Sequence, residues 1–452
     1  MADGGEGTVD SLVNSTGGTS NNTYFEGMIK YKMNQIEKAI LAGIYLQHES
    51  RQKTDYSMDE LRRLAETADA EVQMVFTQQR THIDPSWFMG KGKIEELAAA
   101  ISELGTDLVI FNSKLSPSQI RNIENKLEIK IIDRTQLILD IFAKRARSKE
   151  GKIQVELAQL NYLLPRLFGR GKILSRLGGG IGTRGPGETK LETDRRHIRK
   201  RISELKKTLH NIVRHRELYR QRRKKNEILQ VALVGYTNAG KTTLLNKLSN
   251  SEIFAEDKLF ATLDPTSRRV KLQNNKEVIL TDTVGFIQNL PHELIAAFRS
   301  TLEETKEADL ILHVIDSSSP YYVEQIEVVE KQLRGIDAHS IPRINVYNKI
   351  DLINKNFINY EDADNIYISA FNHADLEKLL RAIEKKLIIN WHNYFFKIPS
   401  DRSDLISYIQ KYGNITKKIK WVEEENRWEV NAEIKKGYLN NDLMKYQVNL
   451  YE

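Results

Sequence analysis

Short apolar runs alternate with amphipathic segments between residues 29 and 148. Runs such as KAILAGIYL at 38–46 and TDLVIFN at 106–112 are typical of buried strands, whereas the segments between them repeat apolar residues every three or four positions. This alternation favours a small α/β domain with a largely parallel sheet. MGKGKIEEL at 89–97 lacks the spacing of a phosphate-binding loop, so we expect a plain turn and the start of a helix there.

The pattern changes between residues 149 and 227, where two apolar stripes recur at alternating spacings of four and three. The stripes consist of Ile153, Leu157, Leu160, Leu164 and Leu167, and of Ile198, Ile202, Leu205, Leu209 and Ile212. Two such stripes predict an antiparallel helical hairpin with the glycine-rich segment 178–187 at its tip. We expect Pro165 to kink the first helix, because proline removes a backbone donor. The second helix, Leu191 to Asn226, would extend about 54 Å at about 1.5 Å per residue.

Strand and helix patterns alternate again between residues 228 and 390, which predicts a second α/β domain. Residues 391–452 contain short amphipathic runs such as KKIKWVEEENRWEVNAEI, which predict a small C-terminal α+β domain. Residues 1–28 open the chain with a stretch rich in Gly, Ser, Thr and Asn, for which we expect a disordered tail. The expected fold class is therefore α/β, with the hairpin between two α/β domains.

Composition narrows the class of protein. The chain has 452 residues, of which 40% are hydrophobic and 29% charged, as in ordinary globular proteins. Cysteine is absent, which excludes disulfides and thiolate metal sites. No apolar run approaches the roughly 20 residues of a membrane span, so we expect a cytoplasmic protein without stable membrane association.

The net charge of +7 is concentrated in one segment. Between Glu188 and Glu227, fifteen Lys or Arg residues stand against six Asp or Glu residues, a surplus of nine. A basic stripe of this kind favours a polyanionic partner such as nucleic acid. A solvated face of a coiled coil would give the same pattern, so both interpretations stay open.

GYTNAGKTT at 235–243 follows an apolar strand and precedes a helical segment, which is the context that a GxxxxGK[ST] phosphate-binding loop requires. Gly235 and Gly240 would let backbone N–H groups approach the phosphates, and Lys241 would neutralise the β and γ oxygens. Thr242 would offer its hydroxyl to Mg²⁺. The motif predicts a P-loop domain that binds a nucleoside triphosphate with Mg²⁺.

Two further motifs complete the expected phosphate site. In LTDTVGF at 280–286, Asp282 is expected near Mg²⁺, and Gly285 is expected to turn its N–H toward the γ-phosphate. The FATLDPT motif supplies two hydroxyls for a loop that senses the γ-phosphate, and we favour Thr262 over Thr266 as the second Mg²⁺ ligand. The expected catalytic residues are Lys241, Thr262 and Gly285.

NKID at 348–351 predicts guanine as the base. Asp351 would accept both N–H groups of the guanine N1/N2 edge through charge-assisted bonds of about 1.5–3 kcal/mol each, whereas adenine presents the wrong pattern. Asn348 and Lys349 would support this loop, and the N–H of Ala370 would meet guanine O6. The residues expected to bind GTP are Gly235, Tyr236, Thr237, Asn238, Ala239, Gly240, Lys241, Thr242, Thr243, Phe260, Ala261, Thr262, Asp282, Thr283, Val284, Gly285, Asn348, Lys349, Asp351, Ser369 and Ala370.

Two other residues affect the expected chemistry. Phe286 occupies the position after Asp-x-x-Gly, where many GTPases carry a glutamine that orients water. Phenylalanine cannot orient water by hydrogen bonding, so we expect intrinsic hydrolysis to be slow and to depend on outside help. His313 lies within the strand pattern LILHVID and is expected to be structural.

With these motifs in place, the sequence resembles the HflX family of GTPases over about residues 29–390. The resemblance rests on PSQIRNIE at 117–124, IIDRTQLILDIFAKRA at 131–146, QVELAQLNYLLPRL at 154–167, GGGIGTRGPGETKLETDRR at 178–196, GYTNAGKTTLLN at 235–246, FATLDPT at 260–266 and LTDTVGFIQNLP at 280–291. Related GTPases of the Obg type share the nucleotide motifs but not this hairpin signature.

The resemblance implies a monomeric GTPase that binds the large ribosomal subunit and splits stalled or idle ribosomes under stress. In that family the hairpin tip approaches the peptidyl transferase centre, so Arg176, Arg184 and Lys190 would meet rRNA phosphates. Asn238 also matches GTPases that use K⁺ in place of an arginine finger, which leaves potassium activation open. Two other functions stay open: a ribosome-assembly GTPase acting on precursor large subunits, and a nucleotide-switched adaptor whose hairpin binds protein. Binding to protein would not weaken steeply with salt, as phosphate contacts must.

Overall fold

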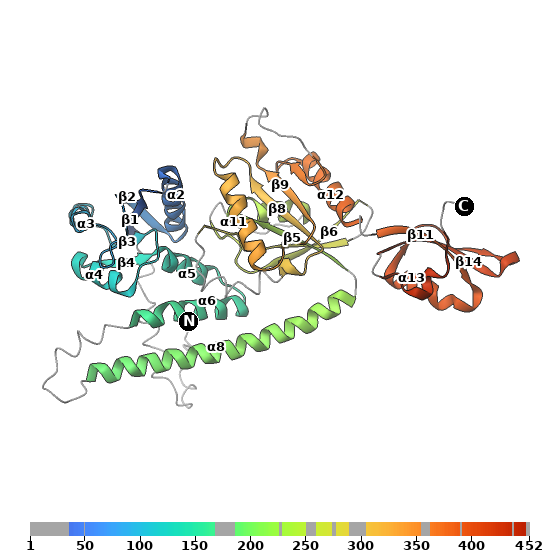
Figure 1. Ribbon diagram of the computed structural model, residues 1–452, viewed down its shortest axis with the longest axis horizontal. Helices are drawn as coiled ribbons and strands as arrows, with labels where there is room; N and C mark the ends of the chain where they lie inside the picture. The colour runs from blue at the N-terminus through green and yellow to red at the C-terminus, as the bar shows by residue number, and fades with distance from the viewer. Residues whose placement is uncertain are drawn as a thin grey trace, which may run out of the picture.

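A computed structural model describes residues 36–48, 50–167, 186–225, 228–249, 259–273, 277–288, 304–353, 362–388, 391–435 and 438–448 (Figure 1). The described strands form three sheets that follow one another along the long axis of the molecule, with the helical hairpin below the first two in this view. The expected tail at 1–28 and most of the expected hairpin tip, at 178–185, lie outside the described residues.

The first sheet is parallel throughout and has the strand order β2-β1-β3-β4. Its strands are β1 (Glu37–Leu46), β2 (Ala70–Arg80), β3 (Leu108–Phe111) and β4 (Lys130–Asp133). The helices between and after them are α2 (Arg51–Thr67), α3 (Lys91–Leu104), α4 (Pro117–Leu127) and α5 (Arg134–Arg145). This confirms the predicted α/β fold with a parallel sheet. The α3 helix begins directly after Gly90, as expected for a plain turn.

The predicted antiparallel hairpin consists of α6 (Lys149–Leu163) and α8 (Pro186–Lys225), which run side by side in Figure 1. The two apolar stripes meet in one seam, because each helix covers the stripe of the other. The buried members of the seam are Ile153, Leu160, Ile198, Ile202 and Leu205. An ion pair between Arg201 and Glu156, with a nitrogen–oxygen distance of 2.7 Å, joins the two helices.

Two details of the hairpin differ from the prediction. The α8 helix begins at Pro186, not at Leu191, and spans 40 residues, because proline fits a first helical turn where its missing N–H loses no partner. Pro165 does not kink α6, because α6 ends at Leu163 and a 3-10 turn, η1 (Leu164–Leu167), follows it. The proline ring clashes with the carbonyl four residues earlier, so the α-helix does not continue through this position.

The second sheet has the order β10-β9-β8-β5-β7-β6 among the described strands. Its strands are β5 (Leu229–Gly235), β6 (Thr266–Lys271), β7 (Glu277–Asp282), β8 (Leu310–Asp316), β9 (Arg343–Asn348) and β10 (Asn365–Tyr367). The helices are α9 (Lys241–Ser249), α11 (Tyr322–Gly335) and α12 (His373–Ile388), with a 3-10 turn, η2 (Ile350–Leu352). All pairs are parallel except β6 with β7, which is antiparallel. We did not predict β6, whose sequence TSRRVK buries only Val270 at the edge of the sheet.

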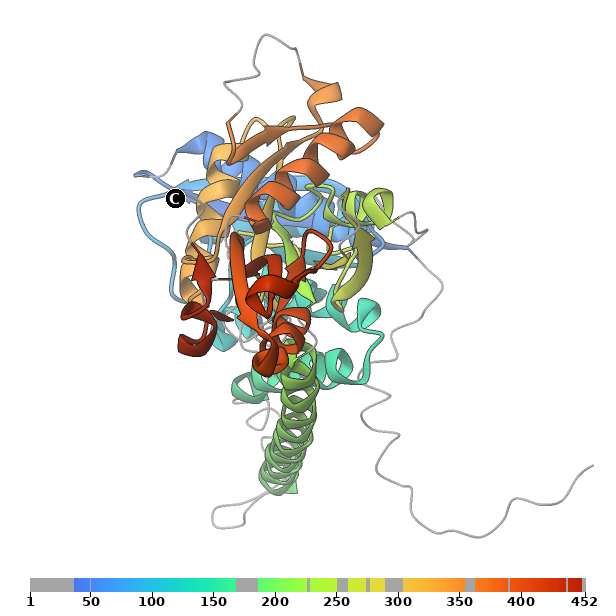
Figure 2. The same ribbon diagram turned by 90° about the vertical axis from the view of Figure 1, so that its right-hand side faces the viewer.

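The C-terminal part is the predicted small α+β unit, and Figure 2 shows it from its own end of the molecule. Its strands are antiparallel: β11 (Trp391–Pro399), β12 (Gly413–Ile415), β13 (Lys420–Val422), β14 (Arg427–Lys435) and β15 (Gln447–Val448). The helices are α13 (Ser403–Tyr412) and the short α14 (Asn441–Met444). This unit has its own apolar core, which includes Phe396, Ile409 and Val430.

The first two sheets are not packed independently. One apolar core runs from α2 and α5 through α6 to the second sheet, and it includes Leu64, Phe142, Val155, Ala232 and Phe286. The hairpin helix α6 therefore lies between the two α/β parts and contacts both. None of the described helices combines the length and apolar content needed to cross a bilayer.

Candidate functional site

The predicted nucleotide residues come together at the carboxyl ends of the central strands of the second sheet. The loop between β5 and α9 carries the GxxxxGK[ST] motif, and the segment after β7 carries Asp-x-x-Gly. The two segments are joined by backbone hydrogen bonds from the Thr237 N–H to the Phe286 carbonyl (2.8 Å) and from the Phe286 N–H to the Gly235 carbonyl (3.1 Å). A cavity between them and the 259–265 loop is lined by Thr237, Asn238, Gly240, Lys241, Thr242, Thr243, Phe260, Ala261, Thr262, Thr283 and Gly285.

Lys241 is held at the base of this cavity. Its side chain is buried, and its Nζ donates to the carbonyls of Gly235 (3.1 Å) and Tyr236 (2.8 Å). Burial lowers the pKa of Lys241 to about 8, while the nearby Asp282 carboxylate counteracts this shift. An ammonium group desolvated in this way is a strong electrostatic partner for phosphate oxygens, because the low local dielectric leaves its charge poorly screened.

Three oxygen-bearing side chains meet beside Lys241. The Thr242 hydroxyl lies 2.7 Å from the Thr262 hydroxyl and 2.7 Å from Oδ2 of Asp282, and Thr262 lies 2.8 Å from the same Oδ2. Asp282 is fully buried, and burial raises the pKa of its carboxyl group. Its second oxygen, Oδ1, is buried without a hydrogen-bond partner among the described residues. One carboxylate oxygen of Asp282 could therefore accept a further partner, at a place where the two threonine hydroxyls already converge.

This donor set fits Mg²⁺, which prefers oxygen ligands and is commonly held by one or two carboxylates together with substrate phosphates. Thr242 and Thr262 would hold the ion, with Asp282 next to them, and the ion would neutralise phosphate charge when bound. Thr266 lies elsewhere: it begins β6, and its hydroxyl is 3.5 Å from the Asp264 carbonyl. The described residues contain no cluster of three His, Cys, Asp or Glu side chains suited to another metal.

Gly285 lies against the phosphate-binding loop so closely that a side chain would not fit. A Cβ at this position would lie 2.8 Å from Cα of Thr237 and 3.1 Å from Nζ of Lys241. Its backbone is thereby held at the wall of the cavity, next to the side chain expected to neutralise the phosphates. The neighbouring Thr283 and Val284 are buried, and the Thr283 hydroxyl donates to the Leu233 carbonyl (2.7 Å).

The predicted base-binding residues form a second group at the ends of β9 and β10. Asn348 is buried and joins two loops: its Nδ2 donates to the Ala239 carbonyl (2.9 Å), and its Oδ1 accepts from the Ala370 N–H (3.1 Å). Ser369 is also buried, and its N–H donates to Asp375 (2.8 Å). Asp351 is exposed on η2, so its carboxylate is accessible to a ligand.

Lys349 has a partner that the sequence did not indicate. Its Nζ lies 2.7 Å from Oδ2 of Asp316, at the end of β8, and its backbone is left-handed with a φ of 65°. The ion pair holds the Lys349 side chain over the carboxyl end of the sheet. The position of Asp316 at the end of the strand LILHVID was the only local signal of this pairing.

Phe286 and His313 lie in the protein interior. Phe286 is 3% exposed and packs in the apolar core, and its side chain is not among those that line the cavity. His313 is buried in β8, and burial lowers the pKa of its imidazole to about 3, which leaves it neutral. In these positions neither side chain can orient a water molecule at the phosphates.

Tyr236 connects the phosphate-binding loop to the N-terminal part of the chain. Its hydroxyl donates to the carboxylate of Glu60 on α2 and accepts from the Gln288 N–H (2.8 Å). Glu60 also pairs with Arg134 on α5, and Arg134 in turn donates to the Gln288 carbonyl (3.3 Å). Tyr236 was expected near the nucleotide because of its place in the motif, but its side chain points into this buried network.

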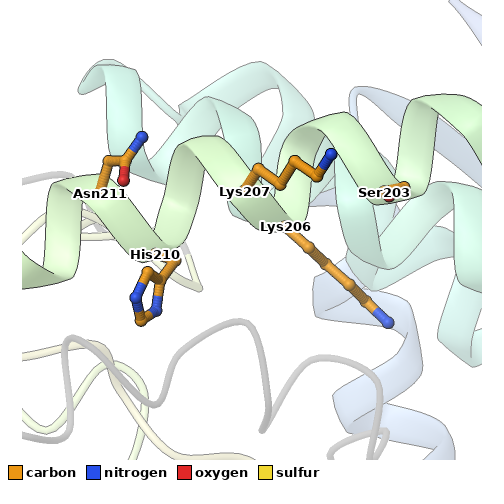
Figure 3. A pocket seen from close by; sticks show the side chains of 5 residues that line it. All are labelled: Ser203, Lys206, Lys207, His210 and Asn211. Carbon is orange, nitrogen blue, oxygen red and sulfur yellow. The ribbon is translucent and has the colours of Figure 1, made fainter.

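A separate candidate surface lies on α8. Ser203, Lys206, Lys207, His210 and Asn211 line a shallow depression, and Figure 3 shows these side chains projecting from the helix. All of them are exposed. No opposing acidic side chain contributes to this described lining. Arg176, Arg184 and the side chain of Lys190, which were expected to contact phosphates near the tip, lie outside the described residues.

Comparison with known families agrees with this site. Residues 55–143 match the model described as "GTP-binding GTPase N-terminal" and residues 145–223 match "GTP-binding GTPase Middle Region". Residues 230–349 match "50S ribosome-binding GTPase". A solved GTP-binding protein from the archaeon Sulfolobus solfataricus, in complex with GDP, aligns with a TM-score of 0.43 and 26% identity over 78% of this chain and 99% of that chain.

Two curated relatives are more similar in sequence. GTPase HflX of Caldanaerobacter subterraneus subsp. tengcongensis is 54% identical over 379 residues, which is 84% of this chain and 87% of the relative. GTPase HflX of Escherichia coli strain K12 is 43% identical over 395 residues, which is 86% of this chain and 91% of the relative. With this similarity over most of its length, and with the phosphate and base sites assembled as described, the chain belongs to the HflX family of GTPases and hydrolyses GTP.

Proposed function

We propose that this GTPase binds the large ribosomal subunit through its hairpin and splits stalled or idle ribosomes, with its tip against rRNA of the peptidyl transferase region. The match of residues 230–349 to a ribosome-binding GTPase family supports a ribosomal partner. Under this proposal the protein acts in the cytoplasm as a monomer and is used under stress. Hydrolysis of GTP then limits how long it stays on the subunit.

The observation that carries the proposal is the charge on the exposed face of α8. Exposed Lys and Arg side chains between residues 192 and 214 are Arg196, Arg199, Lys200, Lys206, Lys207 and Arg214, besides Arg201, which is paired with Glu156 of α6. The exposed acidic side chains in the same range are Glu192, Asp194 and Glu204. A helix covered on one side by α6 and basic on the other is suited to a phosphate backbone, because clustered cations displace condensed counterions from RNA.

The chemistry at the GTP site supports the need for a partner. Lys241 would neutralise the phosphates, Thr262 would sense the γ-phosphate and the N–H of Gly285 would face it. None of these groups is a base that could orient a water molecule, and Phe286 is buried. We therefore propose that hydrolysis is slow in the free protein and is accelerated on the ribosome, with Asn238 as the residue that would hold K⁺.

We also propose a division of the chain into five parts, which are a tail, an N-terminal α/β domain, the hairpin, the GTPase domain and a C-terminal α+β domain. Their ranges are 1–28, 29–148, 149–227, 228–390 and 391–452. Three separate sheets among the described residues support this division, as do the family matches that end at 143 and 223, near the boundaries at 148 and 227.

Cosedimentation with purified ribosomal subunits tests the proposal. The protein should pellet with the large subunit in a non-hydrolysable GTP analogue and not in GDP, and GTP should dissociate whole ribosomes, followed by light scattering. Failure to bind large subunits in every nucleotide state would refute the ribosomal function. Binding only to precursor subunits would favour the assembly role.

Matched variants test the basic face. Lys206→Ala with Lys207→Ala should flatten the slope of log affinity against log salt by about one unit for each lost phosphate contact. Lys417→Ala with Lys418→Ala, an exposed basic pair on the C-terminal unit, should leave the slope unchanged. Equal slopes in both variants would point to a protein partner. Shortening 178–187 to a tight turn should abolish splitting and leave GTP affinity intact.

A further inference from the structure

Asp264 joins the nucleotide site to the hairpin. We name the loop formed by residues 259–265 the sensor loop. Asp264 lies in this loop, two residues after Thr262. Its Oδ2 accepts from the N–H groups of Arg147 (3.0 Å) and Ser148 (2.7 Å), and its Oδ1 accepts from the Ser148 hydroxyl. These partners are the residues immediately before α6. The N-terminus of the first hairpin helix is therefore held by a carboxylate from the loop that borders the GTP site.

Ser148 links this carboxylate to the helix itself. It is the N-cap of α6, and its hydroxyl oxygen accepts from the Gly151 N–H (2.9 Å). Helix N-termini carry unpaired N–H groups and a partial positive charge, so a carboxylate placed there is favoured. Asp264 thus adds a negative charge at the position where α6 attracts one, although it is 116 residues away in sequence.

The packing around Asp264 requires glycine in α6. A Cβ at Gly151 would lie 2.5 Å from Oδ1 of Asp264, closer than van der Waals contact allows. Glycine is among the poorest helix formers, and this one is buried in the first turn of α6. Its presence there is explained by the approach of the sensor loop, because alanine would favour the helix and would displace the carboxylate.

A second contact fixes the other side of Thr262. The ring of Phe260 packs edge-on against Phe142 on α5, with 4.5 Å between the ring centroids, and both side chains are buried. The corner between α5 and α6 therefore contacts the sensor loop before and after Thr262. Since α6 also forms the seam with α8, the sensor loop is connected through α6 to both hairpin helices.

We propose that Asp264 is a positioning residue that couples the nucleotide state to the hairpin, by holding the N-terminus of α6 only while Thr262 faces Thr242 and Asp282. The hairpin's ribosomal partner in this inference rests on the proposed function; the coupling itself does not. Loops of this kind are ordered by contacts to the γ-phosphate and its Mg²⁺ and are released after hydrolysis. Release would withdraw Asp264 from Arg147 and Ser148. By reciprocity, a partner that holds the hairpin would raise the affinity for GTP over GDP.

Hydrogen exchange of the full-length protein tests the coupling without a ribosome. The amides of Arg147 and Ser148 should exchange about tenfold more slowly with a non-hydrolysable GTP analogue than with GDP, because Asp264 accepts from both only in the first state. Gly151→Ala should remove this difference while preserving α6. Asp264→Ala should also remove the difference in exchange, because the carboxylate that accepts from the two amides is then missing.

Gly92→Ala is the matched control. Gly92 also lies in the first turn of a helix, α3, and a Cβ there meets no atom within 4 Å. This variant should keep the nucleotide dependence of the wild type. Equal exchange in the two nucleotide states of the wild-type protein would overturn the coupling, as would an undiminished difference in both Gly151→Ala and Asp264→Ala.

Subunit binding distinguishes this inference from the proposed function. If the wild type prefers large subunits in the GTP state, Gly151→Ala should lose about tenfold of that preference and Gly92→Ala should lose none. A wild type that shows the exchange difference but binds no ribosomal subunit would contradict the proposed function and leave the coupling supported. A wild type that binds in a GTP-dependent way, with Gly151→Ala indistinguishable from it, would contradict the coupling alone.

Discussion

Tyr236→Phe should destabilise the protein strongly, although it removes a single oxygen atom. The Tyr236 hydroxyl is buried between the two α/β parts, where it donates to Glu60 and accepts from the Gln288 N–H. Burial, with the Glu60 carboxylate next to it, raises the pKa of this phenol well above its usual range, so it stays protonated as a donor. Phenylalanine fills the same volume without either hydrogen bond.

The expected loss follows from these two bonds. A hydrogen bond to a charged group contributes about 1.5–3 kcal/mol, and a buried N–H left without a partner costs about 1–3 kcal/mol. The loss in the free energy of unfolding should therefore be about 2.5–6 kcal/mol. That is a large fraction of the ~5–15 kcal/mol typical of a folded domain.

Urea unfolding of the full-length protein, followed by circular dichroism, would measure this loss. Tyr45→Phe is the control, because this side chain is only half-buried, and it should change stability by less than about 0.5 kcal/mol. Glu60→Gln and the double variant complete a thermodynamic cycle in which the two sites should be strongly non-additive. A Tyr236→Phe protein as stable as the control would refute the role of this network.

Four other predictions concern the nucleotide site. The pKa of Lys241 is about 8 in the fold and 10.5 in the unfolded chain, so the apo protein should gain stability as pH rises through this window. GTP affinity should fall over the same window, by up to about tenfold per pH unit above pH 8, because the lysine loses its charge. Titration with a fluorescent GTP analogue between pH 7 and 9.5 would measure this, and an affinity that does not change with pH would contradict it. Asp351→Asn should lower GTP affinity at least about tenfold and shift the preference toward xanthosine triphosphate. The variant should lose no stability, because Asp351 is exposed. Unchanged GTP affinity would disprove the assignment of the base site. Turnover measured in K⁺ and in Na⁺ tests Asn238, and equal rates in the two salts would remove the potassium proposal.

Local patterns predicted the parts of the molecule that depend on local physics. The spacing of the GxxxxGK[ST] motif between a strand and a helix predicted where Lys241 and Thr242 would lie, and the structure brings Thr262 and Asp282 to them. Whether these residues bind metal stays a prediction. Stripes of four-and-three spacing predicted the hairpin seam because a helix displays such residues on one face.

The features that were missed depend on contacts between distant segments. Glu60, Arg134 and Tyr236 come from three separate elements, and no spacing in the sequence relates them. The same holds for Asp264 and Ser148, where only the unexplained glycine at position 151 offered a local signal. The β6 strand was missed for another reason: it is an edge strand with one buried side chain, so it lacks the alternation by which strands are found.

The length of α8 has a mechanical consequence. The helix runs as one continuous rod beneath the first two parts of the molecule (Figure 1), and it ends at Lys225, shortly before β5 begins at Leu229 and leads to the phosphate-binding loop. At about 1.5 Å per residue the helix is about 60 Å long, so a tilt of about 5° about its Lys225 end would displace its Pro186 end by about 5 Å. A tilt this small would thereby become, at the far end of α8, a displacement comparable to the size of a nucleobase. Shortening α8 by whole turns would reduce this displacement in proportion.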